Sequence, residues 1–226
     1  GPFIDMDTGE VVWVTAAHCS KFIETCSGDG GSVLNRPFSQ PSPFDGGSCP
    51  SDVIGYSYKA TPNFWDPNTQ NATTDTIAIK LNPGITVTNY VCGSREALGK
   101  DVYLNGNYRV PRINDVICHA GRTTGVKCGV VTAINVTALV NYGCFSRVLE
   151  NLIASSPILQ PGDSGSVAFD PNTGDFLGEG FAGSDNVSLF INPYEIVKVL
   201  HLVPWAPPSP SPSPSPTPTP TPTPSP

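Results

Sequence analysis

The sequence predicts an all-β protein of antiparallel strands with a helix near residue 200, and two observations carry that prediction. Of the 226 residues, 14% are charged while 22 are Gly and 25 are Pro, which suits short strands joined by many turns better than long surface helices. Apolar and β-branched runs also recur between turn signals such as Asn82-Pro83-Gly84. These runs predict strands at Val11–Thr15, Val53–Tyr58, Thr76–Leu81, Val102–Leu104, Gly129–Ile134, Ser166–Phe169, Gly178–Phe181 and Ser188–Ile191.

The helix is expected at Tyr194–Leu202. Apolar side chains recur at helical spacing between Ile196 and Leu200, and they follow Asn192-Pro193. This dipeptide is a helix start signal, because Pro is pre-organised for the first helical position and its missing N–H would have no partner there in any case.

The chain divides near Trp205 into a globular domain, residues 1–205, and a tail, residues 206–226. The tail alternates Ser-Pro and Thr-Pro, so that every second residue has a fixed φ and lacks an N–H, which excludes helix and sheet. Polyproline II at about 3.1 Å per residue would make it a semi-rigid spacer. It resembles the O-glycosylated stalks of algal and plant wall proteins. We expect a linker to a further domain, with a disordered tail as the alternative.

Charge and composition argue against several classes of partner. The formal net charge is −7 and the pI is about 4.8, so the basic surface that binds nucleic acid is missing. No run approaches the roughly 20 apolar residues of a membrane span. The cysteines form no CxxC pair and three histidines are scattered through the chain, so we expect neither a metal nor a cofactor. We also expect a monomer.

The cysteines and sequons indicate an oxidising, extracellular compartment. Three Asn-x-Ser/Thr triplets, at Asn71, Asn135 and Asn186, fit a secreted glycoprotein. Together with the Pro-rich tail they predict secretion, with a cell-wall location as a further possibility. The seven cysteines are Cys19, Cys26, Cys49, Cys92, Cys118, Cys128 and Cys144.

Three short motifs place a histidine, an aspartate and a serine along the chain in that order: TAAHC at 15–19, TDTIAIKL at 74–81 and PGDSGS at 161–166. A serine hydroxyl is a poor nucleophile until an imidazole takes its proton. That imidazole needs a carboxylate to fix its tautomer and stabilise its positive charge. The motifs therefore predict a catalytic triad of His18, Asp75 and Ser164, with His18 as general base and then general acid.

Alternatives exist for two of the three residues. His18 could be a core histidine, and Asp75 could merely cap a turn. An esterase of the α/β-hydrolase class is disfavoured, because that fold orders its triad Ser, Asp, His and needs a G-x-S-x-G frame. Four other aspartates could take the place of Asp75 beside His18: Asp29, Asp45, Asp52 and Asp66. Asp52 is the strongest of these rivals, because an apolar strand follows it too.

In this order the motifs resemble those of the chymotrypsin-like serine peptidases, and the resemblance spans most of residues 10–203. It implies two antiparallel six-stranded β-barrels with the active site in the cleft between them. The stretch CHAGRTTGVKCG at 118–129 looks like the disulfide-closed hairpin of the streptogrisin and α-lytic branch. Pro161 before GDSG and the ending from Gly180 onward fit the same branch. The resemblance implies a Cys118–Cys128 bridge.

The resemblance also assigns roles around the nucleophile. The amides of Gly162 and Ser164 would form the oxyanion hole, and Gly at 162 suits a turn that aims an amide inward. In the chymotrypsin group a buried cation holds the carboxylate that Asp163 matches. The bacterial branch supplies it from a basic residue directly after the first hairpin cysteine, where this chain has His119. We therefore expect a His119–Asp163 contact, with Arg122 as an alternative cation.

Specificity follows from the same resemblance. Ile158, six residues before Ser164, would lie at the base of the primary pocket, where its lack of charge predicts an apolar or small side chain before the scissile bond. Ala182, Gly183 and Ser184 would pair backbone to backbone with the substrate as an added strand.

The N-terminal residues leave the first barrel open to question. In the chymotrypsin-like family a whole strand, and often a cysteine, precedes the TAAHC motif. In this chain only 17 residues precede His18, and none of them is a cysteine. Cys19 would then close a loop with Cys26 or pair upstream of a truncated first barrel. The predicted function is a secreted serine endopeptidase that cleaves protein or peptide substrates through an acyl-enzyme. The alternatives are a catalytically incompetent fragment and a wall-associated binding glycoprotein.

Overall fold

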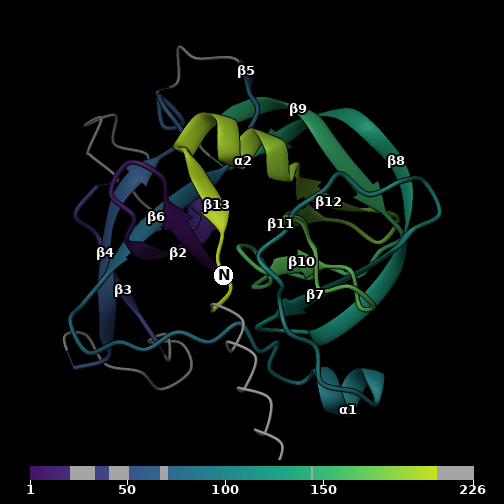
Figure 1. Cartoon of the computed structure of the whole chain (residues 1–226). Coiled ribbons are helices and arrows are strands. Elements are labelled where there is room, and N and C mark those ends of the chain that lie inside the picture. Colours follow the sequence, from purple (N-terminus) through teal and green to yellow (C-terminus); the bar gives the residue numbers. More distant parts are fainter. Residues whose placement is uncertain (21–33, 41–50, 67–70, 144, 208–226) are drawn as a thin grey trace, which may run out of the picture.

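A computed structural model of the chain describes residues 1–20, 34–40, 51–66, 71–143 and 145–207 (Figure 1). These residues form two sheets that lie side by side, one built chiefly from the purple and blue N-terminal strands and the other from the teal and green strands. A single buried apolar cluster contains side chains of both sheets, such as Val12 and Val14 from the first and Leu149 and Leu152 from the second. The two sheets therefore share one interface.

The first sheet has six strands, and all its pairings are antiparallel. A strand precedes the TAAHC motif and pairs both with the strand that contains Val11 and with a strand from residues 202–204. The order across the sheet is β13 (Leu202–Pro204), β1 (Pro2–Asp5), β2 (Val11–Ala16), β6 (Thr76–Leu81), β4 (Val53–Ala60) and β3 (Pro37–Ser39).

The second sheet runs in the order β12 (Ser188–Ile191), β11 (Phe176–Gly183), β10 (Val167–Phe169), β7 (Val116–Gly121), β8 (Gly125–Asn141), β9 (Ser146–Ser155) and β5 (Asn71–Ala72). Strand β12 also pairs with β9, which closes six of these strands into a barrel. Short β5 adds to β9 in parallel. Register shifts along β8 and β9 bend this long hairpin around the barrel.

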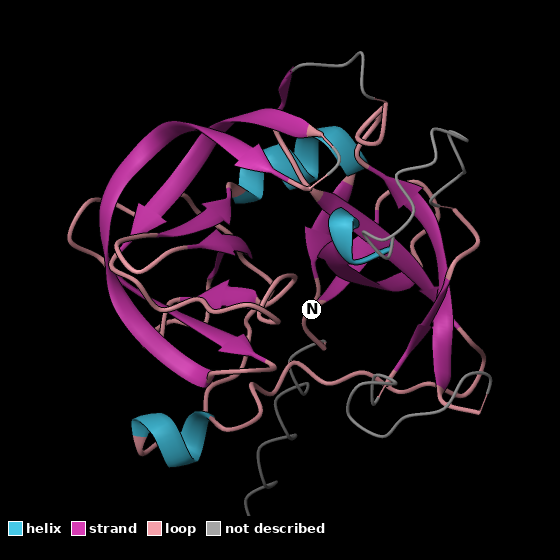
Figure 2. Ribbon diagram, turned by 180° about the vertical axis from the view of Figure 1, so that it is seen from behind, coloured by secondary structure: helices cyan, strands magenta, loops and turns pink. Residues whose placement is uncertain are grey.

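Helix α2 (Pro193–Leu200) closes one end of the molecule, where Figure 2 shows it between the two groups of strands. The side chain of Asn192 accepts a hydrogen bond from the amide of Tyr194 at 3.0 Å, and Pro193 occupies the first turn. Ile196 and Leu200 point into the shared core. The helix ends two residues earlier than the sequence predicts, because residues 202–204 form β13 instead. Two short helices, η1 (Ala17–Ser20) and α1 (Ser94–Leu98), were not expected.

Seven of the eight predicted strands overlap strands of the structure, namely β2, β4, β6, β8, β10, β11 and β12. The prediction of a strand at Val102–Leu104 is wrong. This segment makes a single isolated bridge, between Tyr90 and Tyr103, in the stretch that connects the two sheets. Val102 and Leu104 alternate inward because they pack on Phe169, which gives a strand-like pattern without a strand partner.

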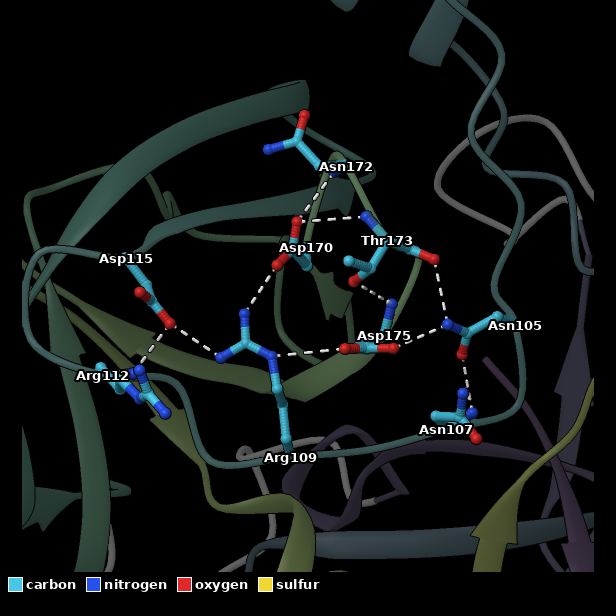
Figure 3. Close-up of polar contacts among 9 residues, drawn as sticks. All are labelled: Asn105, Asn107, Arg109, Arg112, Asp115, Asp170, Asn172, Thr173 and Asp175. Carbon is cyan, nitrogen blue, oxygen red and sulfur yellow. Dashed lines mark hydrogen bonds and ion pairs between the residues drawn. The ribbon is translucent and has the colours of Figure 1, made fainter.

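Arg109 fixes the last part of this connection to the second sheet (Figure 3). Its guanidinium contacts three aspartates: Asp115 at 2.7 Å, Asp170 at 2.6 Å and Asp175 at 3.3 Å. Asp170 also accepts hydrogen bonds from the amides of Asn172 and Thr173, which fix the turn between β10 and β11. Because Asp170 and Asp175 lie at the two ends of this turn, Arg109 holds both ends of it. Such charge-assisted bonds are stronger than bonds between neutral groups.

The predicted disulfide between Cys118 and Cys128 is present and links β7 to β8. Cys19 and Cys92 are free and exposed, whereas Cys26, Cys49 and Cys144 lie outside the described residues. The three sequon asparagines, Asn71, Asn135 and Asn186, are all exposed. Among the described residues, no helix is long and apolar enough to span a membrane. Almost the whole Pro-rich tail, residues 208–226, lies outside the described residues.

Candidate active site

His18 and Asp75 meet because they flank the neighbouring ends of two antiparallel strands. Ala16 at the end of β2 pairs with Thr76 at the start of β6, so the residues just beyond each end come together. The Asp75 carboxylate accepts two hydrogen bonds from His18, one from its amide at 2.9 Å and one from ring Nδ1 at 2.6 Å. The carboxylate thus fixes both the backbone and the ring of His18, as the triad requires.

The pair is largely withdrawn from water. The Asp75 side chain is 0% exposed and that of His18 is 16% exposed. Burial disfavours the charged imidazolium, but the charge of Asp75 and its hydrogen bond outweigh burial, so the pKa of His18 lies above its ordinary value of 6.5. An imidazole in this setting is a strong proton acceptor.

None of the rival aspartates takes this place in the described structure. Asp75 is the aspartate that bonds the His18 ring. The backbone carbonyl of Asp66 accepts a hydrogen bond from Arg147. Asp52 lies next to β4, whose Gly55 pairs with Leu81 at the far end of β6 from Asp75. Asp29 and Asp45 lie outside the described residues.

Ser164 is brought to this pair by a close approach between the two sheets. It lies in the turn before β10, and the next residue, Gly165, packs against the end of β2. A Cβ on Gly165 would lie 2.9 Å from the amide nitrogen of Ala16 and would collide with the Thr15 hydroxyl, and the φ of Gly165 is +84°. Only glycine meets both conditions. The approach places Ser164 and His18 on the wall of one pocket.

The hydroxyl of Ser164 donates to the carbonyl of Phe181 at 3.2 Å. Among the described contacts this is the bond that Ser164 Oγ makes, and the His18 ring bonds Asp75 instead. Among the described contacts, the Ser164 hydroxyl and the His18 ring therefore do not bond each other. Hydrogen bonds between a nucleophile and its base are often long or poorly aligned without substrate and tighten in the complex.

The turn before Ser164 presents two amides. In the described part of the chain, neither the amide of Gly162 nor that of Ser164 donates to a protein acceptor. The hydroxyl of Thr123 donates to the Pro161 carbonyl at 2.8 Å. A trans peptide points its C=O and N–H in opposite directions, so this bond turns the Gly162 amide away from Thr123. Gly162 has a φ of +98°, and a Cβ there would collide with the Thr123 hydroxyl.

Four hydrogen bonds to Asp163 come from neutral donors in the described part of the chain. Its Oδ1 accepts from the amides of Thr123 at 2.8 Å and Thr124 at 3.1 Å. Its Oδ2 accepts from the amide of Gln160 and the hydroxyl of Thr124, both at 2.9 Å. Burial would raise the pKa of Asp163, but these four hydrogen bonds outweigh it and hold the pKa below its ordinary value.

His119 reaches Asp163 only through Thr124. Its Nε2 lies 3.1 Å from the Thr124 hydroxyl and 3.1 Å from the Ile158 carbonyl, and its Nδ1 lies 3.2 Å from the Ser166 hydroxyl. A neutral ring satisfies all of these contacts if Nε2 carries the proton and Nδ1 accepts from Ser166. Burial lowers the pKa of His119 despite the nearby charge of Asp163. The expected direct His119–Asp163 contact is therefore wrong, and His119 is a neutral support beneath the turn.

The pocket that holds His18 and Ser164 has a volume of about 400 Å³. Its walls are residues 140–143, 159–161 and 181–183, which places Ala182 and Gly183 where the sequence predicts them. Ile158 is not part of this lining and packs on the core of the second sheet, while Leu159 faces the pocket. The amide of Ser184 donates to the Val187 carbonyl in the turn to β12, so this amide is not free to pair with a substrate.

Comparison with solved structures identifies the fold. The chain is similar to a glutamic acid specific serine protease that utilizes a histidine triad in substrate binding, at 22% identity and a TM-score of 0.62, over 90% of this chain and 91% of that chain. It is also similar to Nocardiopsis protease, at 20% identity and a TM-score of 0.62, over 90% and 89% of the two chains. The chymotrypsin of Cellulomonas bogoriensis gives 18% identity and a TM-score of 0.60, over 88% and 93%.

The chain has the chymotrypsin-like serine protease fold. No protein-family model matches it, and a search of curated proteins finds no match. The expected all-β, two-barrel fold class is confirmed.

Sequence reasoning missed three residues of the candidate site. Tyr142 donates its hydroxyl to Asp75 at 2.9 Å. Thr124 bridges His119 and Asp163, although it lies in the hairpin that the sequence singles out. Glu179, on β11, accepts a hydrogen bond from the hydroxyl of Thr76 at 2.6 Å. Tyr142 and Glu179 lie outside the motifs, and the hairpin motif does not by itself distinguish Thr124 from its neighbours.

Glu179 is a buried carboxyl, 2% exposed, whose Oε1 has no partner in the described structure. Burial raises the pKa of Glu179 to about 8, although the Thr76 hydrogen bond opposes the shift. The charged groups that face it are Asp75, His18 and the amino group of Gly1. Glu179 therefore keeps its proton at neutral pH, which avoids a second negative charge beside Asp75.

This carboxyl predicts a pH-dependent stability. The unfolded chain releases the proton near pH 4.5, whereas the folded chain holds it up to about pH 8. The folded state thus binds more protons in this window, and its stability falls as pH rises, by at most about 1.4 kcal/mol per pH unit from this group. Glu179→Gln cannot ionise, so its unfolding free energy relative to wild type should increase from pH 5 to pH 8. Denaturant unfolding at several pH values measures this difference.

The control is Glu96→Gln, which changes an exposed glutamate of α1 and should follow the wild-type pH dependence. A difference between Glu179→Gln and wild type that stays constant from pH 5 to pH 8 would contradict the assignment.

Proposed function

We propose that the chain is a secreted serine endopeptidase that hydrolyses peptide bonds through an acyl-enzyme. One observation carries the proposal: His18, bonded to buried Asp75, lines the same pocket as Ser164, near two amides that have no acceptor among the described residues. A binding protein has no need of a nucleophile, a base and unpaired donors in one place.

In the proposed reaction, substrate binding turns the Ser164 hydroxyl from the Phe181 carbonyl toward Nε2 of His18. His18 takes the proton as Ser164 Oγ attacks the carbonyl carbon, and Asp75 stabilises the imidazolium. The amides of Gly162 and Ser164 donate to the oxyanion. His18 then gives its proton to the leaving amine, and the C–N bond breaks to leave an ester on Ser164. A water molecule, deprotonated by His18, hydrolyses that ester and restores the hydroxyl.

The pocket supports an apolar or small residue before the scissile bond. Its walls include Val140, Leu159, Phe181 and Ala182, and no acidic side chain is among the described lining residues. Burying the cation of Arg or Lys against such walls without a partner is unfavourable. Strand β11 pairs with β12 as far as Gly183, but its pairing with β10 ends at Glu179, which leaves its other edge beyond that residue for a substrate strand.

Secretion is supported by the Cys118–Cys128 disulfide and by the exposure of Asn71, Asn135 and Asn186, which leaves each sequon accessible to a glycan. In this proposal the Pro-rich tail, residues 206–226, links the peptidase domain to a further domain or to the cell wall. Glycosylation at Asn186, three residues beyond Gly183 of the pocket, would restrict access by large protein substrates.

Covalent labelling tests the reaction itself. A fluorophosphonate probe should label the wild-type chain at Ser164, because the probe reacts with a serine that a base activates, and Ser164→Ala should lose all labelling. Ser146→Ala, at an exposed serine of β9, should label like the wild type. Equal labelling of Ser164→Ala and wild type, or none of either, would refute the peptidase assignment. Absent labelling would favour an incompetent fragment or a wall-associated binding protein.

The oxyanion role of Gly162 makes a second prediction. Gly162→Ala adds a Cβ that collides with Thr123 and strains a φ of +98°, so the amide should leave its position. Loss of one such donor costs on the order of 10²–10³ in kcat. The matched control is Gly9→Ala, where φ is +75° and a Cβ meets nothing within 4 Å. Steady-state hydrolysis of a peptide ester measures both variants, and a loss below about fivefold in Gly162→Ala contradicts the role.

Specificity is tested with a panel of chromogenic peptides that differ only in the residue before the scissile bond. Leu, Phe and Ala should give kcat/KM values at least about tenfold above those of Arg, Lys and Glu, because a charge without a partner is costly to bury. A preference for Arg or Lys would show that the pocket assignment is wrong.

A further inference from the structure

Tyr142 lies at the tip of the β8–β9 hairpin, and its side chain is buried at 7% exposure. Its hydroxyl donates to Oδ2 of Asp75 at 2.9 Å, the same oxygen that accepts from the His18 ring at 2.6 Å. The remaining described bond to this carboxylate comes from the His18 amide. Tyr142 is thus the one described donor that reaches Asp75 from the second sheet.

The ring of Tyr142 is held on several sides by residues of both sheets. Phe145 stacks on it at 5.2 Å and 22°, and Phe64 meets it edge-on at 5.3 Å and 81°. The guanidinium of Arg147 lies over Phe64 at 5.6 Å and over Phe145 at 5.1 Å. Such aromatic packing fixes the direction of the phenol. The hydroxyl therefore has little freedom to leave the carboxylate.

The same hairpin tip forms a wall of the pocket, through residues 140–143. The Tyr142 ring also lies 5.7 Å from the His18 ring, centroid to centroid. Tyr142 therefore lies between the pocket wall and the carboxylate of Asp75, which bonds His18. A substrate that contacts Asn141 or Gly143 in the pocket would therefore contact the residues directly adjacent to Tyr142.

We propose that Tyr142 is a positioning residue of the peptidase reaction: from the β8–β9 hairpin tip it holds the Asp75 carboxylate against His18 and couples pocket occupancy to that contact. The inference rests on the function proposed above. Tyr142 touches neither the scissile bond nor the transferred proton, and it acts through Asp75.

The hydroxyl also tunes the base. A donor to Asp75 draws off part of the negative charge, so its removal strengthens the attraction between Asp75 and the imidazolium and raises the pKa of His18. Because the reaction needs neutral His18, the acid limb of the kcat/KM profile then moves to higher pH. The other titratable and charged groups around this network are Glu179 on β11, Cys19 on η1 and Arg147 on β9, and the substitution leaves all three in place.

The test is Tyr142→Phe, which keeps the ring and removes the donor. We expect kcat to fall about tenfold and KM to change less than about twofold, because a bond to a buried carboxylate is lost while the pocket wall remains. The acid limb should move upward in pH. A purely structural role would lower activity at all pH values and leave the limb in place.

Tyr58→Phe is the matched control. Tyr58 also donates to a buried carboxylate, at 2.7 Å to Asp5, but it lies on β4 in a network outside the pocket. It should leave the kcat/KM profile unchanged. If Tyr142→Phe matches wild type in both kcat and acid limb, or if both variants lose activity equally, the positioning role is refuted.

Substrate length tests the coupling. In the wild type, extending a dipeptide amide to a tetrapeptide that reaches the hairpin tip should raise kcat as well as affinity. In Tyr142→Phe the gain in kcat should be lost and the gain in affinity retained. An equal gain in kcat in both proteins would overturn the coupling.

The titration of His18 gives a readout that needs no turnover. The chain has three histidines, so NMR resonances of the His18 ring can be assigned with His119 and His201 variants. The pKa of His18 should be higher in Tyr142→Phe than in wild type and unchanged in Tyr58→Phe. Failure of fluorophosphonate labelling with this shift present refutes the peptidase function but retains the Tyr142–Asp75 contact. Normal labelling without the shift refutes the role of Tyr142.

Discussion

The approach of the Ser164 turn to the end of β2 is the contact on which the rest of the candidate site depends. His18 and Asp75 belong to the first sheet, and Ser164 belongs to the second. The sheets come close enough because Gly165 has no side chain where it meets Thr15 and Ala16, and because its amide donates to the Gly180 carbonyl at 2.7 Å. A side chain at 165 would separate the nucleophile from its base without changing either sheet.

Both buried aspartates of the site are satisfied largely by oriented neutral groups. Asp163 accepts from three amides and the hydroxyl of Thr124. Asp75 accepts from the amide and ring of His18 and from the Tyr142 hydroxyl. Fixed dipoles of this kind stabilise a charge without adding a mobile counter-ion that could titrate. The described hydrogen bonds that hold Asp163 therefore do not require a charge on His119, and the proposed reaction keeps one titrating base, His18.

The His18–Asp75 part of the candidate triad was predictable from sequence because its placement is local. TAAHC puts His18 two residues beyond a strand, and TDTIAIKL puts Asp75 one residue before another, so antiparallel pairing of those strands joins them. The hairpin at 118–128 is likewise local, since its disulfide pairs residues directly opposite each other on β7 and β8.

The failed predictions depend on long-range packing or on register. Strand β9 has an irregular pattern, because buried Arg147 alternates with apolar residues and Asn151 breaks the period with a φ of +59°. Ile158 was assigned to the pocket, but its neighbour Leu159 faces it, since a change of one position reverses the direction of an extended side chain. Three of the four donors to Asp163 come from Thr123 and Thr124, about 40 residues away in sequence, in a turn whose composition says nothing about its target.

Two segments of the second sheet, the Ser164 turn and the β8–β9 hairpin tip, enclose the His18–Asp75 pair from different sides. Each carries a hydroxyl: that of Ser164 donates to the Phe181 carbonyl and, in the proposed reaction, turns to His18, whereas the ring of Tyr142 is held by Phe64 and Phe145. The difference follows from the chemistry each must serve. A nucleophile has to move along the reaction coordinate, while the carboxylate behind the base must stay fixed so that little reorganisation accompanies proton transfer. The orientation of the two sheets therefore sets the geometry of the base as well as the access of the nucleophile.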